Sequence, residues 1–203
     1  MKKATSENHK RYLERINLYK KFGYDINEER KSILERVLPL SGKILEVGTG
    51  KGYFTLELAK EGYSFTSVDM SEEEQKLARL NVEYLGLDKK IDFRIENAEH
   101  LSFDDESFDV IFLINTLHHL VNPFKVIDEL ARIVTPEGKI VLSDFSTEGL
   151  RVVDKVHASE GRRHPVSKIN LADIEKYLLR KNFRVEKHKD KFQEILIAHH
   201  QII

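Results

Sequence analysis

The chain has 203 residues, of which 40% are hydrophobic and 33% charged, and this predicts one globular domain with a sizeable core. Its net charge of −1 provides no overall field that would attract nucleic acid or an anionic membrane. No apolar run approaches the length of a membrane span. The absence of cysteine excludes disulfides, zinc–thiolate sites, iron–sulfur clusters and any mechanism with a cysteine nucleophile.

The opening segment predicts two helices. A polar helix is expected over residues 7–22, and no apolar h-region precedes it, so we expect no secretion signal and a cytoplasmic location. Asp25 and Glu28 have the spacing of a capping box, which predicts a second helix over 26–38. Pro39 follows and ends that helix.

Strands and helices then alternate along the chain. Ser71 and Glu74 predict a second capping box, and Pro136 and Gly138 separate a helix from the strand that follows. We expect strands over 43–48, 63–69, 91–95, 109–114 and 139–145, and helices over 52–60, 72–86, 123–134, 148–159 and 170–181.

Two further strands, 183–190 and 193–199, are joined by a short turn and must therefore be antiparallel. Near-continuous apolar strands separated by amphipathic helices predict an α/β fold with helices on both faces. The expected fold class is a doubly wound, Rossmann-like, seven-stranded, mostly parallel sheet with an antiparallel terminal hairpin. We divide it into amino-terminal helices over 1–38, a central core over 40–145 and a terminal segment over 146–203.

A glycine loop follows the first strand of the expected sheet. Its glycines are Gly48, Gly50 and Gly52, and Glu46 lies two positions before the first of them. Such a turn lets backbone N–H groups approach a ligand closely at the carboxyl end of a strand. A dinucleotide fingerprint needs a glycine at the position of Tyr53, so this spacing argues against nicotinamide binding.

Polar residues also end the next three strands. Asp69 lies 17 positions after Gly52, near the offset at which an acid meets ribose hydroxyls in nucleotide-binding sheets. The third strand leads into Asn97-Ala98-Glu99, and the fourth leads into Asn115 and the pair His118-His119. Right-handed crossovers bring all these strand ends to one edge of the sheet.

These four segments, in this order, resemble the class I S-adenosylmethionine-dependent methyltransferases, and the histidine pair is similar to their small-molecule branch. The resemblance covers about residues 40–200 and implies one methyltransferase domain over 1–203 with S-adenosylmethionine as cofactor. It implies that the cofactor is bound by Glu46, Gly48, Thr49, Gly50, Gly52, Asp69, Met70, Asn97, Ala98, Glu99 and Asn115.

The resemblance also implies individual roles. Glu46 would hold the ammonium group of the methionine moiety, Asp69 would accept from both ribose hydroxyls, and Met70 would pack against adenine. Asn97 stands where the family commonly has an aspartate, and its amide oxygen can still accept one hydrogen bond from the adenine amino group.

Methyl transfer mainly requires alignment and exclusion of water, and a base is needed only when the acceptor loses a proton. His118 and His119 are the candidate catalytic residues, although adjacent residues on a turn do not both face a site easily. Tyr12 and Tyr19, on helices that form a lid in such enzymes, and the pair Arg162-Arg163 are candidate substrate-binding residues. The predicted acceptor is a small molecule.

Other interpretations stay open at this stage. His157 and His164 would bind a metal with the histidine pair only if the fold brought all four together, and we predict no metal. The lysine-rich stretch 176–191 is either a partner surface or the protection of a sheet edge. The alternatives to catalysis are a cofactor-binding subunit or a partner module of an RNA or protein methyltransferase, and then a nicotinamide oxidoreductase.

Overall fold

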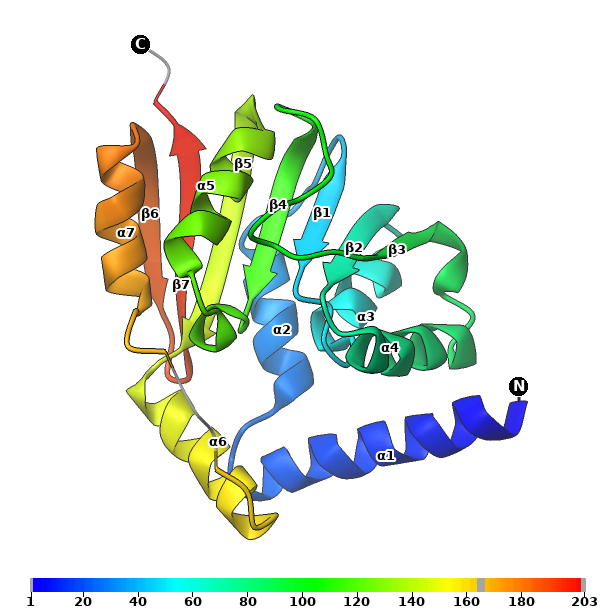
Figure 1. Ribbon diagram of the computed structural model, residues 1–203. Coiled ribbons are helices and arrows are strands. Elements are labelled where there is room, and N and C mark those ends of the chain that lie inside the picture. Colours follow the sequence, from blue (N-terminus) through cyan, green and yellow to red (C-terminus); the bar gives the residue numbers. More distant parts are fainter. Residues whose placement is uncertain (1, 164–166, 202–203) are drawn as a thin grey trace.

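The computed structural model describes residues 2–163 and 167–201, and within them one seven-stranded sheet forms the centre of the molecule. The strand order is β3-β2-β1-β4-β5-β7-β6, which confirms the predicted doubly wound fold class (Figure 1). The strands are β1 (Ile44–Val47), β2 (Phe65–Asp69), β3 (Ile91–Ile95), β4 (Phe108–Ile114), β5 (Val134–Phe145), β6 (Phe183–Lys189) and β7 (Gln193–His200).

Strand directions follow the prediction. β1 pairs in parallel with β2 and β4, β2 with β3, and β4 with β5, whereas β7 is antiparallel to both β5 and β6. The tight turn of the hairpin closes with a bond from Asp190 N–H to the carbonyl of Gln193. β6 lies at one edge of the sheet and pairs with β7, so Lys187 and Lys189 are on an edge strand, where lysines can discourage further strand pairing.

Helices cover both faces of the sheet. α5 and α7 pack on one face, and α2 and α3 pack on the other. The helices are α1 (Lys2–Lys21), α2 (Ile26–Glu35), α3 (Tyr53–Lys60), α4 (Glu72–Tyr84), α5 (Pro123–Ile133), α6 (Thr147–Ser159) and α7 (Leu171–Arg180), with short 3-10 turns η1 (Asp88–Lys90) and η2 (Leu117–His119). None of the helices in the described ranges combines the length and the hydrophobicity that a bilayer crossing requires.

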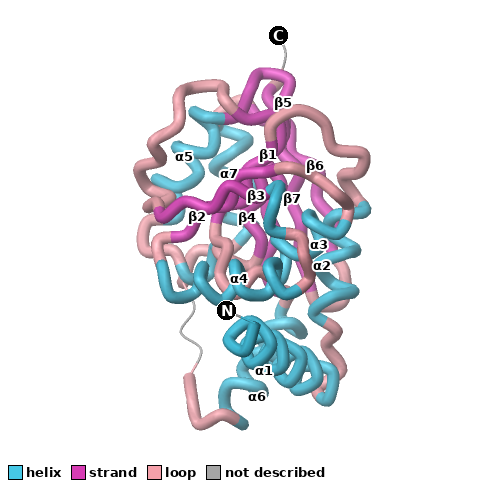
Figure 2. Tube along the Cα trace, turned by 90° about the vertical axis from the view of Figure 1, so that its right-hand side faces the viewer, coloured by secondary structure: helices cyan, strands magenta, loops and turns pink. Residues whose placement is uncertain are grey.

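Two helices lie across the carboxyl ends of the parallel strands, α1 and α6 (Figures 1 and 2). They share a core cluster in which Tyr12 and Ile16 of α1 join Val153 and Val156 of α6. A stack of rings also fastens α1 to α4, because His9 lies 4.2 Å from Tyr84, centroid to centroid. The edge that carries the predicted ligand-binding loops is therefore partly covered.

The amino-terminal helices differ from the prediction in their ends. The first begins at Lys2 rather than at residue 7, and the second ends at Glu35 rather than at residue 38. Asp25 caps the second helix by accepting from the N–H groups of Asn27 and Glu28, as expected of an N-cap. The helix then stops before Pro39, because the residue preceding a proline is driven out of the helical conformation.

The fifth strand is longer than predicted. It begins at Val134, directly after α5, and includes the Pro136 and Gly138 that were expected to precede it. The pairing with β4 jumps from Phe108↔Val134 to Val110↔Lys139, so the intervening residues form a bulge. A bulge tolerates proline because the displaced residues make no ladder hydrogen bond.

Candidate active site

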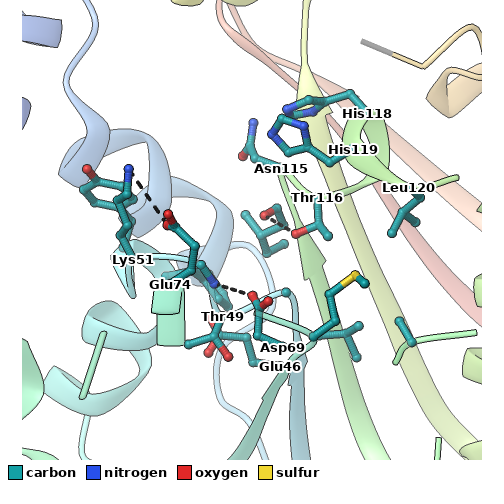
Figure 3. A pocket seen from close by; sticks show the side chains of 18 of the residues that line it. Glu46, Thr49, Lys51, Asp69, Glu74, Asn115, Thr116, His118, His119 and Leu120 are labelled. Carbon is teal, nitrogen blue, oxygen red and sulfur yellow. Dashed lines mark hydrogen bonds and ion pairs between the residues drawn. The ribbon is translucent and has the colours of Figure 1, made fainter. Parts of the chain in front are cut away.

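A pocket of about 560 Å³ lies at the carboxyl edge of the sheet, between the strand ends and the covering helices. It brings together both candidate catalytic histidines and most of the other residues singled out in the sequence (Figure 3). The predicted residues that line it are Glu46, Gly48, Thr49, Gly50, Asp69, Met70, Asn97, Ala98, Glu99, Asn115, His118, His119, Tyr19 and Arg162.

Three predicted site residues do not line this pocket. Gly52 begins α3 with φ +82°, and a Cβ there would stand 2.8 Å from that of Ala78, so this glycine allows α3 and α4 to approach. Tyr12 is buried against Tyr53, with ring centroids 5.2 Å apart. Arg163 is exposed and is not part of the pocket lining.

The glycine loop uses its amides differently from the expectation. The N–H groups of Gly48 and Thr49 donate to the carbonyl of Val68, and that of Gly50 donates to Asp69. The N–H of Gly52 donates to the carbonyl of Thr49. These four amides are therefore not available to a ligand. These amides do not face a ligand as expected, because neighbouring β2 already accepts from three of the four, through the Val68 carbonyl and the Asp69 carboxylate.

The first glycine of the loop is required by the strand beside it. Gly48 has φ +86°, and a Cβ there would lie 2.2 Å from Oγ1 of Thr116. The neighbouring Asn115 also has a left-handed backbone, with φ +51°, at the end of β4. Both amide atoms of its side chain are buried without a hydrogen-bond partner in the described structure. An amide left in this state on a pocket wall indicates a ligand that completes its bonding.

Asp69 joins the glycine loop to the start of α4. Its Oδ2 accepts from Gly50 N–H at 2.7 Å, and its Oδ1 accepts from Ser71 N–H at 2.8 Å. Ser71 caps α4 as predicted, by accepting from Glu74 N–H. Asp69 takes the Ser71 N–H that a capping box would give to Glu74, so only the first half of the predicted box forms.

Glu46 is in β1, two residues before the glycine loop, and is 2% exposed. Its Oε2 accepts from the hydroxyls of Thr55 at 2.7 Å and Ser67 at 2.6 Å. Burial raises the pKa of Glu46 to about 7, and these two hydrogen bonds oppose the rise while the nearby Asp69 adds to it. A cation placed next to this carboxyl group would return it to the charged form.

The segment after β3 forms a turn at the rim of the pocket. Oδ1 of Asn97 accepts from Glu99 N–H at 2.9 Å, which leaves its second lone pair for a ligand. The Glu99 carboxylate in turn accepts from the amide of Asn122. Two apolar side chains stand exposed on the rim, Met70 at 74% and Val121 at 86%. Such exposure of apolar groups on a pocket edge suits a flat, partly apolar ligand.

The two histidines are held differently. His118 is buried, its Nδ1 lies 2.6 Å from Oδ1 of Asp144, and its backbone N–H donates to Oδ2 of the same carboxylate. His119 is more exposed, with its ring 4.1 Å from that of His118. Partial burial and the neighbouring His118 lower the pKa of His119 to about 4. Asp144 therefore orients the ring of His118.

Residues 45–142 match the family model described as a methyltransferase domain. This stretch is just under half of the chain, which is thus similar to a methyltransferase domain over these residues. The match runs from β1 to β5 and so includes the glycine loop, Asp69, the turn after β3 and the histidine pair. It agrees with the predicted resemblance to the class I S-adenosylmethionine-dependent methyltransferases and with S-adenosylmethionine as their cofactor.

Curated relatives of this chain carry quinone-related names. The demethylmenaquinone methyltransferase of Clavibacter sepedonicus is 34% identical over 61% of this chain and 50% of its own length. The ubiquinone biosynthesis O-methyltransferase of Dechloromonas aromatica is 34% identical over 61% of this chain and 53% of its own length. The chain thus spans about half the length of the curated relatives it matches.

A likeness in fold extends further along this chain than the likeness in sequence. The crystal structure of the PH0226 protein from Pyrococcus horikoshii superposes with a TM-score of 0.70 and 21% identity. The superposition covers 86% of this chain and 89% of that protein. The shared fold therefore reaches well beyond residues 45–142.

The polar lining of the pocket suits S-adenosylmethionine. The carboxylates of Glu46 and Asp69 both line it, and the amide atoms of Asn115 are buried there without a hydrogen-bond partner among the described residues. Above Gly50 a Cβ would meet nothing within 4 Å, so the floor of the pocket is open at the loop. These features agree with the cofactor that the family implies.

The four histidines of the metal hypothesis do not form a recognisable metal centre. His118, His119 and His157 line the same pocket, whereas His164 lies outside the described residues. Across residues 2–163 and 167–201, no group of three or more His, Cys, Asp or Glu is placed to hold a metal ion.

Sequence reasoning missed several polar residues in or beside the pocket. Asp144, which holds the pocket residue His118, is the next-to-last residue of β5, and the strand-end rule that selected Asp69 applies to it equally. Arg15 lies four residues before Tyr19 on α1, a spacing that places both on one side of the helix. Arg30 and Lys51 carried no signal, because nothing in their sequence neighbourhood distinguishes them from surface cations.

Proposed function

We propose that this chain transfers a methyl group from S-adenosylmethionine to a small-molecule acceptor. The observation that carries the proposal is the glycine loop, whose four amides at residues 48, 49, 50 and 52 are all bonded within the protein. A pyrophosphate is bound by free amides at a helix start, so such a loop does not suit a dinucleotide. It suits a nucleoside without phosphate, held by Asp69 and Glu46 on either side.

The cofactor roles follow from chemistry at each position. Asp69 retains acceptor capacity on both oxygens and would receive the ribose hydroxyls. Glu46 would pair with the ammonium group, directly or through water, and Met70 with Ala98 would contact adenine. Asn97 and Asn115 would complete their hydrogen bonds on the adenine and on the methionine side.

Arg30 joins this set because it is a buried cation on the pocket wall. It is 7% exposed, and its Nη1 donates to the hydroxyl of Tyr24 at 3.1 Å. No carboxylate among the described residues forms a salt bridge with it. A buried guanidinium without a counter-ion is costly, so we assign to it the carboxylate of the methionine moiety.

The sulfonium of the cofactor supplies an activated methyl group, so the protein must align the acceptor and remove its proton where it has one. We assign Nε2 of His118 as the atom that accepts the proton of the methyl acceptor. The Asp144 carboxylate next to Nδ1 keeps the imidazole's own proton on Nδ1, so Nε2 can act as a base. His119, the other candidate base, lies beside it and would line the acceptor space.

The acceptor in this proposal remains a small molecule, and its identity is not specified by the relatives' names. Tyr19 and Arg162 line the pocket and remain candidate acceptor contacts. Tyr12 acts at most through the packing of α1, and Arg163 lies outside the pocket lining. The cytoplasmic location predicted from the sequence is kept as part of this proposal.

Calorimetric titration tests the proposal first. Wild type and the Asp69→Ala variant are titrated with S-adenosylmethionine, S-adenosylhomocysteine and NAD. We expect micromolar binding of the first two, lost in the variant, and no binding of NAD. Tighter binding of NAD, or no binding of either adenosyl compound, would contradict the proposal. Asp104→Ala, a carboxylate outside the pocket, is the matched control.

A further inference from the structure

Three cations gather on the α1–α6 side of the pocket, and we call them the cation cluster: Arg15, Lys51 and Arg162. They come from α1, from the glycine loop and from the segment after α6. Segments far apart in the sequence thus bring positive charge to one wall. Chance solvent-facing lysines and arginines do not converge on a cavity in this way.

The cluster has fewer carboxylates than cations. Arg15 Nη1 lies 2.6 Å from Glu160 Oε1, and Arg162 bonds to the other oxygen of the same carboxylate. Lys51 Nζ lies 3.9 Å from Glu74 Oε2, the long pair drawn in Figure 3. Within the described residues, three cations thus share two carboxylates.

The lowered pKa values of Lys51 and His157 agree with a positive local field at the cation cluster. Burial lowers the pKa of Lys51, and Arg15 and Arg162 lower it further against the pull of Glu74. Burial, Arg162 and Arg15 likewise lower the pKa of the adjacent His157, whose Nε2 lies 3.5 Å from Arg15 Nη2. An anion placed here would relieve the repulsion among these groups.

We propose that the cation cluster binds an anionic group, a carboxylate or phosphate, of the methyl acceptor. This inference rests on the proposed function and specifies its substrate class. The carboxylate of the cofactor is already assigned to Arg30, which is 7% exposed. The Arg162 side chain, by contrast, is 49% exposed at the mouth of the pocket, where an acceptor would enter. Guanidinium groups bind carboxylates and phosphates through two parallel hydrogen bonds, which explains the two arginines.

In the absence of that anion, Glu160 forms salt bridges with both Arg15 and Arg162. Although partial burial raises the pKa of Glu160, the bond from Arg162 and the charge of Arg15 bring it below its ordinary value. It therefore stays charged at neutral pH and competes with an incoming anion. Removing its charge should strengthen anion binding, whereas a purely structural role for Glu160 predicts no such gain.

The test uses protein already saturated with S-adenosylhomocysteine, at constant ionic strength. Inorganic phosphate, benzoate and neutral benzamide are titrated into wild type and into Arg162→Gln, Glu160→Gln and Arg163→Gln. Arg163→Gln is the matched control, because it removes the same charge one residue away and outside the pocket lining. Melting temperatures confirm that each variant is folded.

We expect phosphate or benzoate to bind wild type, about tenfold more weakly to Arg162→Gln, more tightly to Glu160→Gln and unchanged to Arg163→Gln. Preference between the two anions distinguishes a phosphate-bearing from a carboxylate-bearing acceptor. Equal binding of benzamide, binding of neither anion, or equal losses in Arg162→Gln and Arg163→Gln would overturn the inference. Failure of S-adenosylhomocysteine to bind at the outset would instead overturn the proposed function.

Discussion

Asp144 holds His118 at two points, with Oδ1 2.6 Å from the ring Nδ1 and Oδ2 3.0 Å from the backbone N–H. A single carboxylate thereby determines where the imidazole lies and which nitrogen carries its proton. The two residues come from neighbouring strands, since Asp144 belongs to β5 and His118 follows β4. The parallel pairing of β4 with β5 therefore brings the two residues together.

Asp144→Asn tests this arrangement. The amide can present its NH₂ to Nδ1, which favours the tautomer with the proton on Nε2 and removes the acceptor from the pocket. We expect nitrogen NMR shifts of His118 to report an Nδ1-protonated ring in wild type and the other tautomer in the variant. With an acceptor in hand, kcat should fall by about 10²-fold or more while S-adenosylhomocysteine affinity is kept.

His119→Gln is the control for that experiment, because its ring lies beside that of His118, whereas Asp144 holds His118 at the ring and the backbone. A smaller loss of kcat is expected there than in His118→Gln. If His119→Gln abolishes turnover and His118→Gln does not, the base is assigned to the wrong histidine.

Glu46→Gln should change how stability depends on pH. The folded pKa of about 7 lies above the ordinary 4.5, so the stability that Glu46 supports is present at low pH and lost as pH rises through 7. Glutamine removes that loss. The variant should match wild type near pH 5 and exceed it at pH 8, by up to about 3 kcal/mol in urea unfolding. A constant difference at every pH would contradict the raised pKa.

Cofactor binding should release protons near pH 6.5. An ammonium group beside Glu46 favours the charged carboxylate, so the carboxyl group gives up its proton as the ligand binds. Calorimetry in buffers of different ionisation enthalpy measures that release. Glu46→Gln should abolish the dependence on buffer. A release that persists in the variant would come from another group and would weaken the assignment of Glu46.

Arg30→Gln should weaken only ligands that carry the amino-acid portion. We expect about tenfold weaker binding of S-adenosylhomocysteine and unchanged binding of 5′-methylthioadenosine, which lacks that carboxylate. Arg36→Gln is the control, since Arg36 bonds to Asp190 away from the pocket. Equal losses for both ligands would indicate that Arg30 acts through packing.

Two glycines of the loop should respond differently to alanine. At Gly48 the new methyl group would collide with Thr116, and we expect a loss of about 2–4 kcal/mol in urea unfolding. At Gly50 a Cβ meets nothing within 4 Å, so only the left-handed backbone, with φ +49°, costs about 1 kcal/mol. Adding Thr116→Ala to Gly48→Ala should recover part of the loss, and equal costs at both glycines would refute the steric account.

Periodicity and turn residues predicted the mostly parallel sheet and nearly all the elements, because each apolar run and each cap acts locally. The start of β5 was not predicted: it begins at Val134 because pairing with β4 outweighs the punctuation of Pro136 and Gly138. That pairing is between residues distant in sequence, and local signals do not report it.

The candidate site was predictable where a residue ends a strand, as for Asp69 and Asn115. It was not predictable where a helix crosses the sheet edge, as for Arg15, whose neighbours Glu160 and His157 come from a distant segment. The orientation of the glycine-loop amides was likewise hidden, since it depends on the carbonyl of Val68 in the adjacent strand.

The two backbone bonds that Asp69 accepts have a consequence for the thermodynamics of recognition. Gly50 and Ser71 fix the rotamer of this carboxylate before any nucleoside arrives. Association therefore loses no side-chain conformational entropy at Asp69, a term of about 0.5–1.5 kcal/mol for a side chain that must be immobilised. A ribose that binds at Asp69 would therefore meet a carboxylate whose orientation was set when the protein folded.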